Sequence, residues 1–205
     1  MKAPLPHPPP LIDSTQYYSV NCQNYFDTTV QFNMATLYDL FLPYLPKGSK
    51  ILDAGCGSGR DSKYFIDQGY SVSAFDGSSQ MAELASEFTG LAIQHKYFSD
   101  LYEKEKYDGI WTSASLLHVP QVELPATLQK LKAALKPNGI WYMSFRKGES
   151  ECHEGDRYFN DQTESSLLSI LEQLGDLEIL YLGTPDHLCS RRGYQFVSAI
   201  VRLTP

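Results

Sequence analysis

Short apolar runs alternate with segments of helical periodicity from Lys50 to the end of the chain. The apolar runs predict strands, and the segments whose apolar residues recur every three or four positions predict helices. Strands are expected over 50–56, 70–76, 91–98, 107–113, 140–145, 177–183 and 193–203. Helices are expected over 59–68, 78–88 and 123–136, and from an N-cap at Thr163 to Gly175. The alternation favours an α/β fold with one parallel sheet covered on both faces.

The N-terminal region departs from this pattern. Five of the first ten residues are prolines, so a flexible tail is expected over 1–13. The stretch 14–46 predicts two helices, because Met34, Leu37, Leu40 and Phe41 fall on one helical face before two prolines. Residues 14–205 contain no repeat and no second core pattern. We therefore expect one domain whose helical segment 14–46 covers the sheet.

Composition and charge narrow the classes of partner. A net charge of -7 disfavours binding to nucleic acid or to anionic membranes. No apolar run approaches the ~20 residues of a membrane span, and the first residues lack the apolar region of a secretory signal. The four cysteines are widely spaced and form no CxxC motif, which is typical of a reduced compartment. A cytoplasmic protein, a monomer or a homodimer, is expected.

The segment "ILDAGCGSGRDSKYF" (51–65) follows a predicted strand and contains Gly55, Gly57 and Gly59. A glycine-rich turn between a strand and a helix is typical of a nucleotide-binding loop, although it can also be a tight turn without a ligand. A dinucleotide motif needs a small residue where Arg60 stands, and Asp53 is poorly placed beside a pyrophosphate. The loop therefore favours a ligand with an amino group and a ribose but without phosphate.

A second carboxylate supports the prediction that the ligand contains a ribose. Asp76 ends the next predicted strand, 21 positions after Gly55, where a carboxylate accepts hydrogen bonds from two ribose hydroxyls. NAD would use this residue equally. Asp100 follows the third predicted strand and is placed to accept from an adenine amino group. Asp53 itself has an alternative role, because it can satisfy the amides of its own loop.

These segments resemble class I S-adenosylmethionine (SAM)-dependent methyltransferases. The resemblance rests on "ILDAGCGSGRDSKYFIDQGYSVSAFDGS", "YDGIWTSASLLHVP" and "LKPNGIWYMSF", and it extends over about residues 15 to 202. Within that superfamily the chain is most similar to small bacterial methyltransferases related to tellurite resistance. The resemblance implies a Rossmann-like sheet of order 3-2-1-4-5-7-6 with the last strand antiparallel.

The resemblance also assigns cofactor residues by position. It implies that Gly55 and Gly57 hold the methionine part, that Asp53 reaches its amino group and that Asp76 holds the ribose. The remaining cofactor-binding residues that it implies are Tyr18, Tyr25, Arg60, Gly77, Met81, Asp100, Leu101 and Ser113. Arg60 would meet the SAM carboxylate, and Ser113 would line the sulfonium side.

The acceptor side is less defined. His118 ends "SASLLH" and is a candidate base for an oxygen or nitrogen acceptor, or else a structural histidine. The segment 146–162 and the N-terminal helices are expected to form a mobile cover over a small-molecule acceptor. The C-terminal part of the chain contains five cations that either select an anionic acceptor or lie on the surface. They are Arg146, Lys147, Arg157, Arg191 and Arg192. The pairs Cys152/His153 and His187/Cys189 lack zinc-finger spacing, so no metal is expected.

Three functions remain open from the sequence. The first is a SAM-dependent methyltransferase acting on a small molecule, with an anion, a metalloid species or a thiol among the acceptors. The second is a SAM-binding sensor or regulatory protein without catalysis. The third is an NAD-dependent oxidoreductase, which Arg60 in the loop disfavours.

Overall fold

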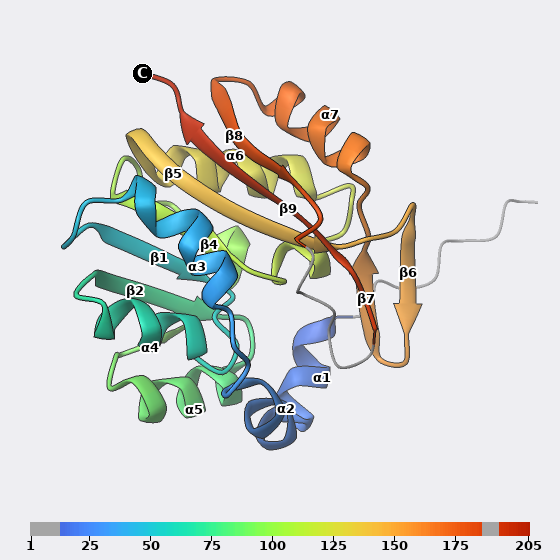
Figure 1. Cartoon of the computed structure of the whole chain (residues 1–205). Coiled ribbons are helices and arrows are strands. Elements are labelled where there is room, and N and C mark those ends of the chain that lie inside the picture. Colours follow the sequence, from blue (N-terminus) through green and yellow to red (C-terminus); the bar gives the residue numbers. More distant parts are fainter. Residues whose placement is uncertain (1–12, 186–192) are drawn as a thin grey trace, which may run out of the picture.

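A computed structural model describes residues 13–185 and 193–205, and its centre is a seven-stranded sheet (Figure 1). The strands are β1 Lys50–Ala54, β2 Ser71–Asp76, β3 Gln94–His95, β4 Tyr107–Thr112, β5 Leu135–Arg146, β8 Leu177–Gly183 and β9 Phe196–Leu203. Their order is β3-β2-β1-β4-β5-β9-β8. The first five strands are parallel, and β9 runs antiparallel to both β5 and β8. This is the order that the resemblance implied, with β9 as the antiparallel seventh strand.

Helices cover both faces of this sheet. They are α3 Ala35–Phe41, α4 Arg60–Asp67, α5 Ser79–Thr89, α6 Leu124–Ala134 and α7 Glu164–Leu174. Side chains of β5 alternate between the two faces, as the period of a strand requires. Trp141 packs in the core beneath α6 and α7, whereas Tyr142 packs in a second core with Phe41 of α3 and Phe65 of α4. The expected helix start at Thr163 is confirmed, since its side chain accepts from the backbone N–H of Ser166 at 3.0 Å.

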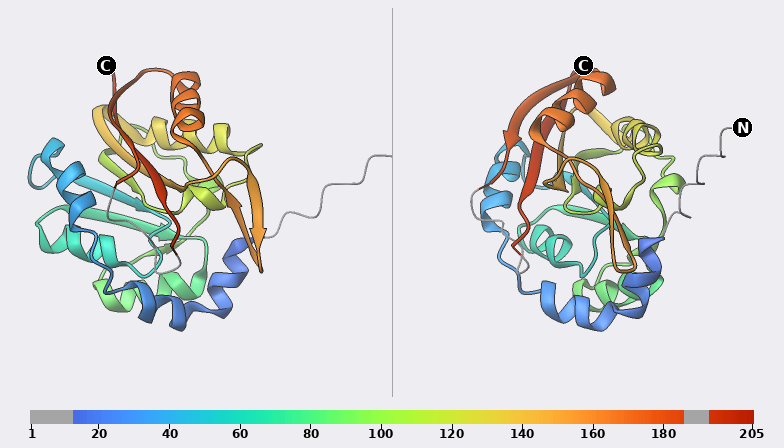
Figure 2. Two further views of the ribbon diagram at one scale, coloured as in Figure 1. Left: turned by 45° about the vertical axis from the view of Figure 1, so that its right-hand side comes forward. Right: turned by 90° about the vertical axis from the view of Figure 1, so that its right-hand side faces the viewer.

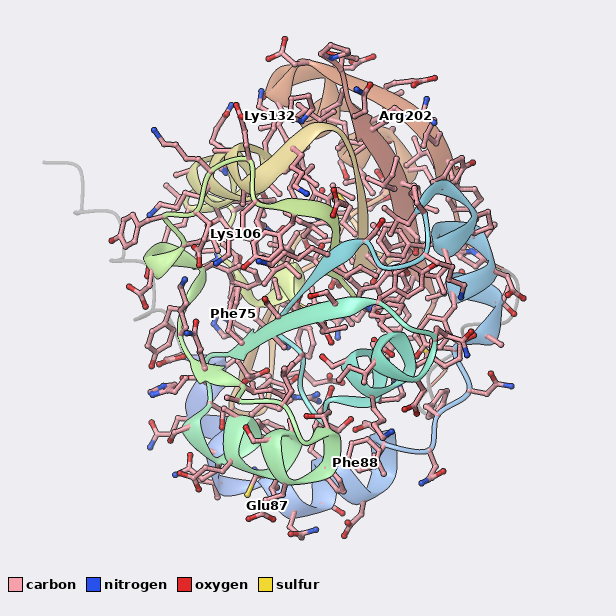
Figure 3. The ribbon with its side chains drawn as sticks, turned by 90° about the vertical axis from the view of Figure 1, so that its left-hand side faces the viewer. Phe75, Glu87, Phe88, Lys106, Lys132 and Arg202 are labelled. Atoms are coloured by element: carbon pink, nitrogen blue, oxygen red, sulfur yellow. The ribbon has the colours of Figure 1, made fainter. Side chains whose placement is uncertain are left out.

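The N-terminal region contains three α-helices where the sequence predicted two. They are α1 Ser14–Val20, α2 Cys22–Thr29 and α3, which is followed by a 3-10 turn over Leu42–Tyr44. An asparagine side chain bonds the backbone at each of the two breaks between these helices. Asn21 turns its side chain back onto the carbonyl of Tyr17 at 2.8 Å, and Asn33 caps the N–H of Ala35 at 2.9 Å. Helix α2 packs against α5 through two rings: the ring centroids of Phe26 on α2 and Phe88 on α5, which Figure 3 labels, are 5.6 Å apart.

The third and the fifth predicted strands differ most from the structure in their bounds. The third strand was predicted over 91–98, but β3 is only Gln94–His95 because it pairs with β2 alone, at the edge of the sheet. A 3-10 turn over Phe98–Asp100 follows it directly. The fifth strand begins at Leu135 rather than at 140, so α6 ends two residues earlier than predicted. The left-handed backbone at Asn138 (φ 62°) accommodates this turn within β5.

The sequence assigned no secondary structure to the segment 146–162, and the mobile cover expected there stays a prediction. The segment contains an antiparallel hairpin of β6 Glu151–Glu154 and β7 Arg157–Asn160, joined through Gly155 at φ 59°. Figures 1 and 2 show the hairpin beside α1, at the end of the molecule toward which β1 and β2 point. Contacts between α1 and β7 are direct, since the backbone N–H of Tyr158 donates to Ser14 Oγ at 3.0 Å. No helix among the described residues is long and apolar enough to cross a membrane.

Candidate functional site

Two cavities lie at the edge of the sheet where β1, β2 and β4 end. The first cavity has a volume of about 380 Å³ and lies against β2 and the start of α5. The second cavity, of about 400 Å³, lies between the N-terminal helices, β5 and β7. Both cavities are lined by Tyr18, Tyr25, Gly55, Gly57, Ala114 and His118. The two cavities therefore meet over the glycine-rich loop, as ligand sites of open α/β sheets do at strand ends.

The glycine-rich loop is held by backbone bonds and needs its glycines for space. The N–H groups of Gly55 and Cys56 donate to the carbonyl of Phe75 at 2.9 and 3.0 Å. Gly55 has φ +78°, and a Cβ there would lie 2.5 Å from Cβ of Ser115. Gly57 has φ +54°, and its N–H donates to Asp76 Oδ2 at 2.9 Å. The loop backbone thus forms a wall of both cavities that a ligand can approach closely.

The first cavity matches the predicted adenosine site in three residues. Asp76, Gly77 and Met81 all line it, together with the rings of Phe75 and Phe98. Asp76 accepts from the N–H of Gly57 and, through Oδ1, from the N–H of Ser78 at 2.9 Å. Burial raises the pKa of Asp76, and these two backbone donors oppose the shift. Each carboxylate oxygen has a lone pair left for a hydroxyl, so the residues present fit a ribose beside a flat base.

Three residues that the resemblance implied line neither cavity. Asp53 is buried and accepts from Ser62 Oγ at 2.6 Å; burial and the neighbouring Asp61 raise its pKa to about 8. Asp100 is exposed, because the 3-10 turn directs its side chain back to the N–H of Tyr97 at 3.1 Å. Leu101 is 2% exposed and packs in the core. Residues 96–99 line the first cavity in place of Asp100 and Leu101.

His118 lies where the two cavities meet and has a hydrogen bond on each ring nitrogen. It ends the 3-10 turn Leu116–His118 after β4. Its Nδ1 lies 2.7 Å from the carbonyl oxygen of Tyr158, and its Nε2 lies 2.7 Å from the hydroxyl of Tyr18. Burial, with smaller contributions from the cations Arg157 and Arg146, lowers the pKa of His118 to about 4, while the hydrogen bond to Tyr158 opposes the shift. The imidazole is therefore neutral at pH 7.

Ala114 is a cavity residue that the sequence reasoning did not single out, although it belongs to the stretch 112–118 that was expected to line the site. It lies directly after β4 and Ser113, with φ 50°, a left-handed conformation that costs energy for a residue with a Cβ. Its N–H donates to Ser144 Oγ at 2.8 Å, and the next residue, Ser115, bonds the carbonyl of Ala54 at 2.7 Å. These bonds hold the β4 end against β1 and β5. Ser113, which the resemblance placed at the sulfonium side, lines the second cavity.

The second cavity combines aromatic walls with three arginines. Arg60 makes two bonds to Asp61, at 2.7 and 2.9 Å, so the expected contact with the SAM carboxylate stays a prediction. Asp61 also accepts from Tyr38 and Trp111, which fixes this ion pair beneath the loop. Arg146 likewise makes two bonds to Asp161, at 2.7 and 2.8 Å.

Arg157 is held differently from the other two arginines. Its guanidinium lies over the rings of Tyr17 and Phe159, 4.8 and 4.9 Å from their centroids. It reaches Glu154 at 3.4 Å and the hydroxyl of Tyr18. Among the described residues, its Nε is buried without a hydrogen-bond partner. Arg157 therefore has donor capacity that the protein itself leaves unused.

Some predicted residues do not belong to these cavities. Lys147 lines neither and bonds Thr184 Oγ1 at 3.3 Å. Arg191, Arg192, His187 and Cys189 lie outside the described residues. Cys152 contacts Arg146 and Asp161 in the hairpin. Within 13–185 and 193–205, no three His, Cys, Asp or Glu side chains are grouped to hold a metal ion.

Comparison with known proteins identifies the family. A family model described as a methyltransferase domain matches residues 26–175. The chain is 27% identical over 157 residues to an uncharacterized methyltransferase of Staphylococcus carnosus, covering 72% of this chain and 76% of that protein. It is 32% identical over 108 residues to a ubiquinone biosynthesis O-methyltransferase of Actinobacillus pleuropneumoniae, covering 47% of this chain and 45% of the relative. The chain thus matches less than half the length of that enzyme.

A solved structure shares the whole fold. The 1,6-didemethyltoxoflavin-N1-methyltransferase of Burkholderia thailandensis, solved with 1,6-didemethyltoxoflavin and S-adenosylhomocysteine, superposes with a TM-score of 0.77 at 21% identity. The superposition covers 100% of this chain and 94% of that one. The family match over most of the chain, the strand order and the glycine-rich loop facing Asp76 agree with one another. The chain belongs to the methyltransferase domain family and is a class I SAM-dependent methyltransferase.

Proposed function

We propose that this methyltransferase modifies a small planar acceptor that carries an anionic group, and that the anion pairs with Arg157 in the second cavity. The observation that carries the proposal is the difference between Arg157 and the other two arginines of that cavity. Carboxylates already take two bonds each from Arg60 and Arg146. Arg157 instead reaches Glu154 at 3.4 Å and the hydroxyl of Tyr18, and its Nε is buried without a hydrogen-bond partner among the described residues.

The aromatic residues of the second cavity support a planar acceptor body. Tyr142, Phe159, Tyr194 and Phe196 line it, and such walls favour flat apolar ligands with a few polar contacts. The guanidinium of Arg157 lies over the rings of Tyr17 and Phe159, and these contacts pre-orient it for an oxyanion. The relatives named for ubiquinone biosynthesis and for 1,6-didemethyltoxoflavin act on small ring compounds by their names, and this supports the same class of acceptor.

The protein's contribution is binding, orientation and exclusion of water. SAM bound in the first cavity would supply a methyl group already activated by its sulfonium. Asp76 and Gly57 would hold the ribose side, and Tyr18, Tyr25 and the loop would position the methyl donor beside the second cavity. Positioning alone can lower a barrier by about 7–11 kcal/mol in favourable cases.

Two alternatives remain as outcomes of the test. A thiol or metalloid acceptor, which the resemblance to tellurite-resistance-related methyltransferases suggests, would need no anion contact. A SAM-binding regulator would bind cofactor without turning over any acceptor. The second cavity, with about 400 Å³ of space beside the loop, supports an enzyme over a regulator.

The test uses labelled SAM and a panel of paired acceptors, each ring compound as its carboxylate and as its amide, with thiols and tellurite as separate arms. Turnover of carboxylates over amides is expected. Arg157→Gln should raise the acceptor KM about 10- to 100-fold, because a hydrogen bond to a charged group is worth roughly 1.5–3 kcal/mol. Lys147→Gln is the matched control, since Lys147 belongs to the same segment but lines neither cavity. Equal turnover of amides, or an unchanged KM in Arg157→Gln, would contradict an anionic acceptor.

A further inference from the structure

We propose that Tyr18 and His118 form a proton path that removes the proton from an oxygen or nitrogen acceptor, with the backbone carbonyl of Tyr158 fixing the reactive tautomer. This inference rests on the proposed function. It gives Tyr18 a role in proton transfer in addition to lining the cofactor cavity. It also assigns the acceptor atom to a class, a hydroxyl or an N–H group rather than a thiol, which needs no base.

The hydrogen bonds of His118 decide which nitrogen carries the proton. A backbone carbonyl only accepts, so the 2.7 Å contact between Nδ1 and the carbonyl oxygen of Tyr158 requires a proton on Nδ1. In a neutral imidazole the other nitrogen then has a lone pair. Nε2 therefore accepts the 2.7 Å bond from the hydroxyl of Tyr18. The resting arrangement is a chain of donors that runs from Tyr18 through His118 to Tyr158.

This chain lies where the two cavities meet. Tyr18 and His118 each line both cavities, although they are 100 positions apart in the sequence. A hydroxyl oxygen has two lone pairs, so one remains on Tyr18 after it donates to Nε2 and accepts from the guanidinium of Arg157. Since Tyr18 borders the second cavity, an acceptor hydroxyl or N–H there can donate to this oxygen. The geometry thus offers a proton acceptor on the side where the acceptor binds.

The proton balance follows from these positions. The acceptor's proton passes to Tyr18 Oη while the proton of Tyr18 passes to His118 Nε2, and the electron pair stays on the acceptor oxygen or nitrogen. His118 becomes an imidazolium that donates from Nδ1 to the Tyr158 carbonyl and from Nε2 to Tyr18. Both partners can accept these bonds, so no side chain needs to turn. The proton then leaves to water when the product is released.

Charged and titratable groups on four elements, α2, β2, β5 and β7, face this chain. The ring of Tyr25 on α2 contacts the Tyr18 ring edge-on, with the ring centroids 4.9 Å apart. Burial is the largest cause of the lowered pKa of His118, and Arg146 on β5 and Arg157 on β7 lower it as well. Burial, Tyr25 and Asp76 on β2 raise the pKa of Tyr18 more than Arg157 lowers it, so Tyr18 stays protonated and donates. The two arginines disfavour an imidazolium in the resting protein. An anionic group on the acceptor offsets their charge and favours proton uptake by His118 during the reaction.

A purely structural role of the same hydrogen bond must be distinguished. The bond also attaches α1 to the rest of the protein, as does the 2.9 Å bond between Ser19 Oγ on α1 and Ser78 Oγ. Ser19→Ala removes that attachment without touching the proton path and lies outside both cavities. It is therefore the matched control for Tyr18→Phe.

The experiment measures binding, turnover and tautomer separately. Calorimetry with S-adenosylhomocysteine comes first, and absence of binding would refute the proposed function rather than the proton path. With a hydroxyl or N–H acceptor, Tyr18→Phe and His118→Asn should lower kcat about 100-fold, within the ~10²–10⁴ range of general-base catalysis, and change KM less than threefold. Their kcat should rise about tenfold per pH unit between pH 6 and 8, while that of the wild type stays flat. Ser19→Ala should keep the flat profile.

Two results would overturn the proton path. The first is a kcat of both variants within threefold of the wild type, in protein that binds S-adenosylhomocysteine and forms product. A loss of kcat in Ser19→Ala equal to that in Tyr18→Phe would count against the path in the same way. The other needs no acceptor: two-dimensional ¹H–¹⁵N spectra of the imidazoles, assigned with His118→Asn, should show the neutral Nδ1–H tautomer of His118 at pH 7. An Nε2–H tautomer or a charged ring would contradict the geometry.

Discussion

Acid should destabilise the folded protein through His118, and the effect can be isolated by removing this one imidazole. The folded-state pKa of His118 is about 4, against 6.5 for an unperturbed histidine. Between these values the unfolded chain binds a proton that the folded protein does not bind. Stability from this group is therefore fully present above pH 6.5 and is lost as the pH falls toward 4.

The magnitude follows from the two pKa values. Linkage gives a loss of about 2 kcal/mol in the free energy of unfolding between pH 7 and pH 5 from His118 alone. Asp53 acts in the opposite direction, because its folded pKa of about 8 lies above the ordinary 3.8. Its contribution is present at low pH and is lost as the pH rises to 8. The wild type shows the sum, so only the difference from a His118 variant is diagnostic.

The assay is urea unfolding of wild type, His118→Asn and His153→Asn at pH 5, 6 and 7. His153 is exposed on β6 and lines neither cavity, so its variant should keep the wild-type pH dependence. In His118→Asn the fall in unfolding free energy from pH 7 to pH 5 should be smaller by about 2 kcal/mol. The same fall in all three proteins would refute a buried neutral His118.

Two further substitutions test the loop and the ion pair beneath it. Gly55→Ala should weaken S-adenosylhomocysteine binding at least tenfold by calorimetry, because the added Cβ would displace Ser115. Gly48 has a similar φ of +80° with nothing within 4 Å of an added Cβ, so Gly48→Ala should bind as the wild type does. Equal affinities of the two variants would contradict the steric argument. Asp61→Asn should lower the urea unfolding free energy by about 3–5 kcal/mol, because Arg60 loses its buried partner, while exposed Asp67→Asn should cost less than about 1 kcal/mol. A difference below about 1 kcal/mol between these two would show that Asp61 is not a buried ion-pair partner.

The sequence allowed the sheet and the loop to be predicted, because both depend on local patterns. Apolar runs placed β1, β2 and β4 within two residues of their observed ends, and Asp76 was found as the carboxylate that ends the second of these runs. The hydrophobic pattern predicted the wrong bounds for the strand at the edge of the sheet. There β3 has a neighbour on one side only, and the following 3-10 turn directs Asp100 away from the cavity.

Contacts between distant segments could not be predicted from one sequence. The bond between Tyr18 and His118 depends on how α1 packs on the finished domain, and the pairing of Arg146 with Asp161 depends on the hairpin. The hairpin itself left a signal that went unused. The pair Gly155–Asp156 stands between two short runs that can pair as strands, and Gly-Asp is a favoured two-residue hairpin turn.

The central claim is that the first cavity holds the cofactor through Asp76, and calorimetry tests it most directly. S-adenosylhomocysteine should bind the wild type in the micromolar range with one site per chain, and NAD at the same concentration should give no binding heat. Asp76→Asn should bind about 10- to 100-fold more weakly, because hydrogen bonds to a charged carboxylate are worth roughly 1.5–3 kcal/mol. Unchanged affinity in Asp76→Asn, or tighter binding of NAD than of S-adenosylhomocysteine, would contradict the account.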